Sequence, residues 1–158
     1  MIQRQNRQRG SFLLEALIAI MIVALGVLGS VGLLARSVQD MDDARNRGEA
    51  AYLANQLIGQ MWLTDRLTAN LDTQYSSAVG SGTGYLDFKS LVEQRLPNAD
   101  QYTQEVIVGA GPIPANLASS VVTVRIYWCP PGEWTLGACR GALNRPHEYD
   151  VTASIGAN

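Results

Sequence analysis

The sequence predicts an α+β fold, with a long N-terminal helix packed on a small antiparallel sheet of three or four strands. Twenty consecutive residues, Ala16 to Ala35, carry no charge, and no proline interrupts the chain until Pro97. Three segments in the C-terminal half alternate apolar and polar side chains and are rich in branched residues, which is typical of strands. Short connections between these segments favour antiparallel pairing with one face of the sheet covered by the helix.

The helix is expected to extend from about Phe12 to about Leu67. At 1.5 Å per residue its uncharged part would be about 30 Å long, the thickness of the hydrocarbon core of a bilayer. The second part is apolar on one side only, with a repeat of three and four residues that predicts packing on a domain core: Ala50, Ala54, Leu57, Ile58 and Met61. Three glycines of the first part are spaced three apart, at Gly26, Gly29 and Gly32. This spacing differs from the four-residue spacing of the favoured packing motif of membrane helices. Local flexibility, close approach of neighbouring helices, or an incidental occurrence in a membrane helix would account for the three glycines.

Downstream elements follow in order. The polar stretch 73–84, which ends in G-S-G-T-G, predicts a surface loop. The segment 85–96 predicts a helix that ends before Pro97, with an apolar face formed by Leu86, Leu91, Val92 and Leu96. The three predicted strands are Gln101–Gly109, Val121–Trp128 and Glu148–Ile155.

Charge is unevenly distributed. Arg4, Arg7 and Arg9 precede the apolar run without an acidic residue among them, and without the first ten residues the net charge of −2 becomes −5. Basic residues before an apolar segment favour a cytoplasmic N-terminus, which would leave the rest of the chain on the other side of the membrane. An acidic domain with one lysine, Lys89, and no basic cluster is a poor nucleic-acid binder.

The two cysteines, Cys129 and Cys139, are separated by nine residues. In an exported domain this spacing favours a disulfide that closes a short loop. Zinc needs four ligands and the chain has one histidine, so no metal site is expected. His147 is interpreted as a surface residue, and the aromatic residues beside the loop, Trp128 and Trp134, as core or loop anchors. No catalytic motif is visible and no cofactor is expected.

Three interpretations of the N-terminus compete. A secretory signal peptide would be removed after the apolar run, near residues 31–36. A plain single-pass anchor would retain the whole chain. Neither explains the acidic Glu15 at the edge of an apolar helix, or the glycine between the basic and the apolar segments.

The segment that contains these two residues, G-S-F-L-L-E after a basic leader, resembles the type III signal of type IV pilins and pseudopilins. The resemblance implies that prepilin peptidase cleaves between Gly10 and Ser11, that Ser11 is N-methylated, and that Glu15 pairs with the terminal amine of a neighbouring subunit and sets the assembly register. It also implies three parts: a leader (1–10), a transmembrane and filament-core helix (11–35), and a pilin-like periplasmic domain (36–158). A serine at the methylated position is less typical of the family.

Shorter segments, including L-L-E-A-L-I-A-I, A-N-Q-L-I-G-Q-M and R-L-P-N-A, are similar to the PilV group of minor pilins. The resemblance implies a non-enzymatic subunit that helps to initiate pilus assembly near the tip. Its partners would be the other minor pilins, the major pilin, prepilin peptidase and the inner-membrane assembly platform. Two alternatives stay open: a minor pseudopilin of type II secretion, and a membrane-anchored periplasmic ligand-binding or sensing domain.

Overall fold

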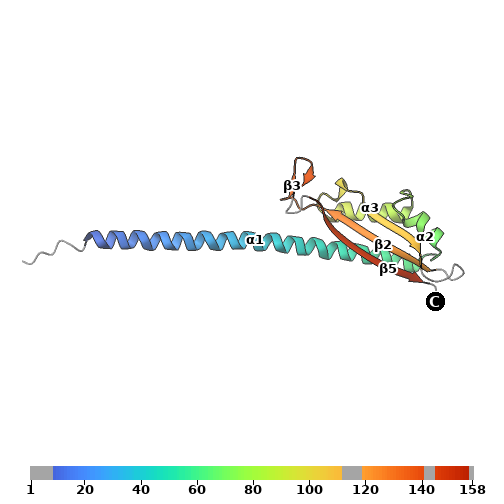
Figure 1. The fold of residues 1–158 in the computed structure, drawn as a ribbon, viewed down its shortest axis with the longest axis horizontal. Coiled ribbons are helices and arrows are strands. Elements are labelled where there is room, and N and C mark those ends of the chain that lie inside the picture. The colour runs from blue at the N-terminus through green and yellow to red at the C-terminus, as the bar shows by residue number, and fades with distance from the viewer. Residues whose placement is uncertain (1–8, 112–118, 141–144, 157–158) are drawn as a thin grey trace, which may run out of the picture. The chain divides into compact units, whose positions relative to one another are not determined.

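The protein is described from a computed structural model, which covers residues 9–111, 119–140 and 145–156, and the side chains from residue 12 onward. The chain divides into two compact units, one ending at Asp42 and the other beginning at Asp43. Helix α1 (Arg9–Leu63) contributes to both units (Figure 1). The first unit, as far as it is described, consists of this helix alone. The predicted leader residues 1–8 lie outside the described residues.

The second unit combines the last part of α1 with two further helices, a short 3-10 turn and two small sheets. The helices are α2 (Thr68–Tyr75), α3 (Thr83–Arg95) and η1 (Ala99–Gln101). The larger sheet is antiparallel, in the order β1-β2-β5, and is formed by β1 (Glu105–Ala110), β2 (Ser119–Trp128) and β5 (His147–Gly156). A two-stranded hairpin, β3 (Trp134–Thr135) with β4 (Ala138–Cys139), lies between β2 and β5 in the sequence. The predicted α+β class and antiparallel sheet are confirmed.

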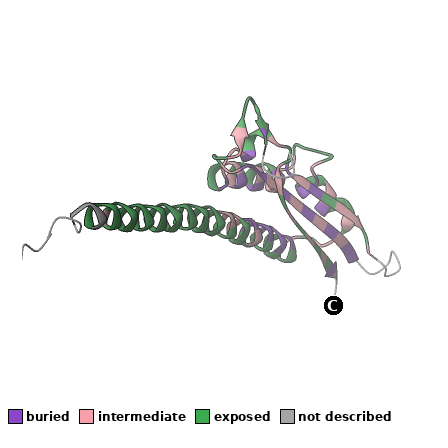
Figure 2. Cartoon of the chain, turned by 60° about the vertical axis from the view of Figure 1, so that its left-hand side comes forward, coloured by how far each residue is buried: buried purple, intermediate pink, exposed green. Residues whose placement is uncertain are grey.

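The core of this unit lies between the sheet and the helices. Every second residue of β2 from Ser120 to Trp128 is buried, so one face of the sheet points inward (Figure 2). The predicted apolar stripe on α1 forms part of the same core as these strand residues. All five predicted residues of the stripe are buried, and Leu53, which was not predicted, is buried with them. Removing such side chains from water is the main favourable term in the folding of this unit.

Three predictions about helices need correction. Helix α1 ends at Leu63 rather than Leu67. Just beyond this end, the Thr64 hydroxyl donates a hydrogen bond to the Met61 carbonyl, and the Arg66 guanidinium donates one to the Gly156 carbonyl. Helix α2 was not predicted, and its last residues occupy the start of the predicted loop; it is anchored in the core by Leu71 and Tyr75. The buried face of α3 consists of Tyr85, Phe88 and Val92, whereas Leu86 is exposed.

Strand β1 also begins later than predicted, at Glu105. At the preceding residue, the side chain of Gln104 and not its backbone bonds the Tyr127 backbone of β2. This side chain is completely buried; its amide donates to the carbonyls of Ala99 and Tyr127, and its oxygen accepts from the Tyr127 N–H. Cys129 follows directly after β2 and is bound to the same region, since its N–H donates to the Pro97 carbonyl and its carbonyl accepts from the Asn98 amide. The cysteine loop is therefore anchored on the connection between α3 and β1.

Candidate functional site

The apolar part of α1, from Phe12 to Leu34, is exposed among the residues that the structure describes. Its large apolar side chains are all at least 47% exposed, on every side of the helix. The helix is long and apolar enough to cross a membrane, by length and composition. A Cβ atom added at Gly26, Gly29 or Gly32 would meet no neighbouring atom within 4 Å, so no close packing among the described residues requires these glycines.

Glu15 is exposed near the start of this helix, among apolar neighbours. Within the part of the chain that the structure describes, no basic group lies within ion-pair distance of its carboxylate. Gly10 and Ser11 belong to the helical backbone, but their side chains lie outside the described residues. Cleavage, methylation and the register role of Glu15 therefore stay predictions.

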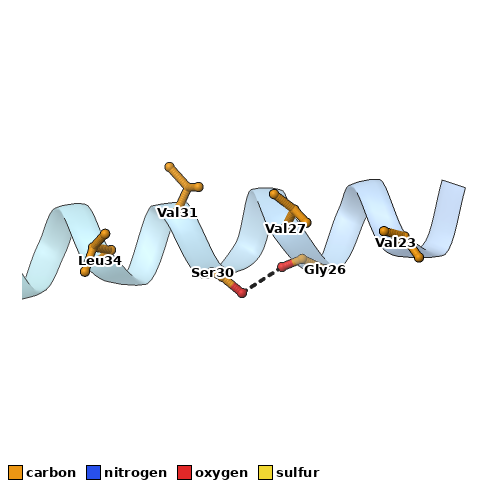
Figure 3. Close-up of a pocket in the computed structure, with 6 residues that line it drawn as sticks. All are labelled: Val23, Gly26, Val27, Ser30, Val31 and Leu34. Atoms are coloured by element: carbon orange, nitrogen blue, oxygen red, sulfur yellow. Dashed lines mark hydrogen bonds between the residues drawn. The ribbon is translucent and has the colours of Figure 1, made fainter. Parts of the chain in front are cut away.

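One face of the same helix carries a shallow apolar groove, lined by Val23, Gly26, Val27, Ser30, Val31 and Leu34 (Figure 3). Its small residues, Gly26 and Ser30, are four apart, a spacing that sequence reasoning missed because it considered only glycines. The Ser30 hydroxyl donates to the Gly26 carbonyl at 2.9 Å. This bond satisfies the hydroxyl within the helix, which lowers the cost of placing a serine in apolar surroundings.

The predicted disulfide is present between Cys129 and Cys139, whose Cα atoms are 5.7 Å apart. The sulfurs and the carboxylate of Glu133 lie within 4.8 Å of one another. Because the sulfurs are bonded to each other, they offer no thiolate to a metal ion. The Glu133 carboxylate therefore lies beside a disulfide and not beside free thiols.

The enclosed loop is held by local contacts. The β3–β4 hairpin turns at Leu136 and Gly137, which have positive φ angles of 52° and 77°. Positive φ at both central residues is the requirement of a type I′ hairpin turn. Trp134 packs edge-on against Tyr102, with ring centroids 6.2 Å apart. Trp128 is completely buried. Both tryptophans therefore anchor the loop or the core, as predicted.

His147 is not the surface residue that the sequence suggested. It is the first residue of β5, and its side chain is 20% exposed. Nε2 lies 2.9 Å from an oxygen of Glu133 in the cysteine loop, and Nδ1 lies 2.9 Å from an oxygen of Asp43 on α1. The ring also packs on Trp128, at a centroid distance of 5.8 Å. No motif could have revealed this, because the three residues are far apart in the sequence.

The outer face of the sheet is polar. Arg125 lies at its centre and pairs with Glu105 at 3.0 Å, and this hydrogen bond raises the pKa of the arginine. Burial raises the pKa of Tyr127, and the negative charges of Glu105 and Glu148 act in the same direction. Thr123 and Thr152 exchange a hydrogen bond across β2 and β5 at 3.0 Å. The polar groups of these two pairs are therefore bonded to one another. The apolar helix and the cysteine loop remain as the two candidate functional regions.

Comparison of the chain with protein-family models, with curated proteins and with solved structures finds no significant match.

Proposed function

We propose that this chain is a minor pilin of the type IV pilin class, which helps to initiate pilus assembly and is incorporated at or near the tip. The observation that carries the proposal is the uncovered apolar part of α1, which begins with the Gly10–Ser11–Glu15 signal and continues into a helix that forms the core of an α+β unit. A surface of this size and apolarity needs cover from lipid or from other helices. A subunit that moves from a membrane into a filament core uses both.

In this proposal, the role of Glu15 comes from the free-energy cost of an unpaired carboxylate in apolar surroundings. An acidic side chain at the centre of a bilayer costs about 2.5–3.5 kcal/mol on the insertion scales. In a packed bundle of helices the same carboxylate is tolerated when a cation lies beside it. The N-terminal amine of a neighbouring subunit is such a cation. Packing at any other axial step leaves both charges unpaired, so the pair selects one register by penalising the others.

The proposal assigns a place to each part of the chain. Residues 1–10 are the cytoplasmic leader that prepilin peptidase removes, residues 11–35 span the inner membrane and later pack in the filament, and residues 36–158 lie in the periplasm and then on the pilus. Oxidising conditions outside the cytoplasm suit the Cys129–Cys139 disulfide. The other minor pilins, the major pilin and the assembly platform are the expected partners.

Incorporation into filaments tests the proposal. Glu15→Ala should leave removal of the leader unchanged and should strongly reduce the amount of this subunit in sheared filaments, measured by immunoblot against the membrane fraction. Asp40→Ala is the matched control, because Asp40 is an exposed acidic residue of the same helix beyond the apolar part. Its incorporation should be normal.

The outcome also separates the alternatives. Normal incorporation of the Glu15→Ala subunit contradicts the register role. Absence of the wild-type subunit from pili, together with its cross-linking to secretion pseudopilins, would favour the type II secretion alternative. A subunit that enters neither kind of filament would favour the anchored ligand-binding or sensing domain.

A further inference from the structure

The two edges of the β1-β2-β5 sheet differ in how far their backbone groups are bonded (Figure 1). At the β1 edge, the Val106 carbonyl accepts from the Ser77 N–H, and the Val106 N–H donates to the Ser77 hydroxyl. At the β5 edge, the carbonyl of Gly156, the last residue of the strand, accepts from the Arg66 guanidinium. Among the described residues, no other hydrogen bond reaches the outer side of β5. Most of this edge is therefore free to pair.

The register of the sheet identifies the β5 residues whose backbone groups point away from it. The Ser119 carbonyl points toward β1, because it accepts from the Gly111 N–H. Successive residues of a strand direct their backbone groups to opposite sides, so the even-numbered residues of β2 bond β5. Their register partners are the odd-numbered residues of β5. The outward-pointing residues between the ends of the strand are therefore even-numbered and all exposed: Glu148, Asp150, Thr152 and Ser154.

Charges alternate across the outer face of the sheet and end on an acid at this edge. Glu105 of β1, Arg125 of β2 and Asp150 of β5 are neighbours in register. Arg125 donates its hydrogen bond to Glu105, at 3.0 Å. Within the part of the chain that the structure describes, neither Asp150 nor Glu148 lies within ion-pair distance of a basic side chain. A basic residue on a further strand would continue the alternation and pair with Asp150.

The core side of β5 fits the same extension. Val122 and Val124 of β2 are completely buried, whereas their register partners Ala153 and Val151 pack on the core but are only partly buried. Apolar side chains on a further strand would remove this remaining surface from water. Side chains alternate between the two faces of a strand. The edge therefore fits a segment with basic residues on one face and apolar residues on the other.

A second copy of this chain does not offer such a strand. The acids of β5 are Glu148 and Asp150, and the strand contains no lysine or arginine. Strand β1 begins with Glu105, and its edge is bonded to Ser77. Charged residues on an edge oppose pairing between like strands, and the same charges favour a strand of opposite sign. The charge pattern thus selects a different chain.

We propose that the β5 edge binds an extended segment of a different protein chain as an antiparallel strand, with a basic side chain opposite Asp150. The outward N–H and C=O groups provide affinity, and the acids of the outer face select the partner. The antiparallel direction lets each outward residue exchange two hydrogen bonds with the residue opposite it. The apolar helix and Glu15 take no part in this contact, so it does not depend on the proposed role in pilus assembly.

Amide hydrogen exchange of the full chain, in micelles of an uncharged detergent, tests whether the edge is free. The N–H groups of Asp150 and Thr152 should exchange at least about tenfold faster than those of Val151 and Ala153, which face β2. Residue-resolved NMR, corrected for intrinsic exchange rates, measures both sets. Equally slow exchange of the two sets would show that the edge is covered, and would overturn the proposal.

The binding probe is a fluorophore-labelled synthetic peptide with blocked termini, Thr-Val-Thr-Val-Lys-Val-Lys, whose lysines fall opposite Asp150 and Glu148. The wild-type chain should bind it in a fluorescence anisotropy titration. Asp150→Lys should bind it about tenfold more weakly, because a like-charge pair replaces an opposite-charge pair. Asp87→Lys is the matched control: it makes the same change of charge at an exposed residue of α3 and should bind as the wild type does.

Two methylated peptides separate strand pairing from charge attraction. N-methylation of the first lysine removes the N–H that would donate to the Asp150 carbonyl, and should abolish binding. N-methylation of the valine before it, whose N–H would point away from β5, should leave binding unchanged. Absence of binding by the unmodified peptide, equal binding of the two methylated peptides, or unchanged affinity of Asp150→Lys would each overturn the proposal.

Discussion

The two halves of α1 have the same backbone structure and opposite surroundings. Leu25 in the first half is 58% exposed, whereas Leu57 in the second half is 2% exposed. Burying a leucine stabilises a fold by about 1.5–3 kcal/mol, so only the second half contributes such terms to folding of the chain by itself. Lipid and other chains are the proposed sources of such stabilisation for the first half. Helical structure alone therefore does not show where a segment finds its partners.

The side-chain pattern distinguishes the two halves. From Phe12 to Leu34 the apolar residues surround the helix, which is typical of a segment that is covered on all sides. From Ala50 to Met61 they form one stripe, while Tyr52 on the other side is 60% exposed. A stripe fits a single core, and an apolar circumference fits a membrane or a bundle. The following predictions test this difference.

The largest effect is expected from one substitution made in each half. Leu57→Ala should lower the free energy of unfolding by about 2–5 kcal/mol, because it leaves a cavity in the core. Leu25→Ala should leave that free energy unchanged. Both are measured by urea unfolding of the full chain in detergent, followed by tryptophan fluorescence, for which the buried Trp128 is a reporter. Similar losses in the two variants would contradict the comparison.

The disulfide should stabilise the second unit alone. Replacing Cys129 and Cys139 together by serine should lower its free energy of unfolding by about 2–3 kcal/mol, since the unfolded chain gains the entropy of an open loop. Helicity of the apolar half, measured by circular dichroism in detergent, should not change. Alkylation of the wild-type protein without reduction should modify neither cysteine; two labelled thiols would refute the pairing.

A smaller effect is expected at Tyr85, whose hydroxyl donates to the Gln104 carbonyl at 2.9 Å within the core. Tyr85→Phe should cost about 1 kcal/mol. Burial raises the pKa of Tyr85, and the charges of Glu93 and Glu105 act in the same direction. The folded state thus favours the neutral phenol, so its contribution is complete below about pH 10 and is lost as the pH rises through the raised value.

Alkaline unfolding curves measure this term. Part of the loss of stability above about pH 10 should disappear in Tyr85→Phe. The same exchange at Tyr52, which is exposed on α1, should change neither the stability nor the pH dependence. An unchanged alkaline curve in Tyr85→Phe would show that this phenol does not couple folding to pH.

The smallest effect concerns the ion pair that joins α3 to the second half of α1. Arg95 Nη1 lies 3.0 Å from Glu49 Oε1, and the arginine side chain is 56% exposed. Arg95→Ala should lower the free energy of unfolding by less than about 1 kcal/mol, because water and salt screen an exposed pair. The loss should shrink further at high salt. A large loss that salt does not alter would indicate a packing role for the arginine stem.

Much of the fold could be predicted from the sequence, for reasons visible in particular residues. The long proline-free run of α1 and the alternation in β2 are strong signals, and the predicted bounds are correct to within a few residues. Helix α2 was missed because two buried residues, Leu71 and Tyr75, are its only apolar pattern in eight positions. On α3, Leu86 was assigned to the core by hydrophobicity, whereas the core takes the aromatic rings of Tyr85 and Phe88.

The candidate functional regions were predictable to different degrees. The exposed apolar helix and the disulfide follow from composition and spacing. The position of His147 does not, because Asp43 and Glu133 reach it only through the register of β5 on β2 and the path of the cysteine loop. A lone histidine acquires its chemistry from tertiary contacts, which have no signature in a single sequence.

The mature N-terminus tests the central claim most directly. Mass spectrometry of the N-terminal peptide, from cells with and without prepilin peptidase, should give a chain that begins at N-methylated Ser11 only when the peptidase is present. The apolar half of α1 would then be kept as an assembly helix. A mature protein that keeps Met1 in the presence of the peptidase, or that begins within residues 31–36, would contradict the proposed function.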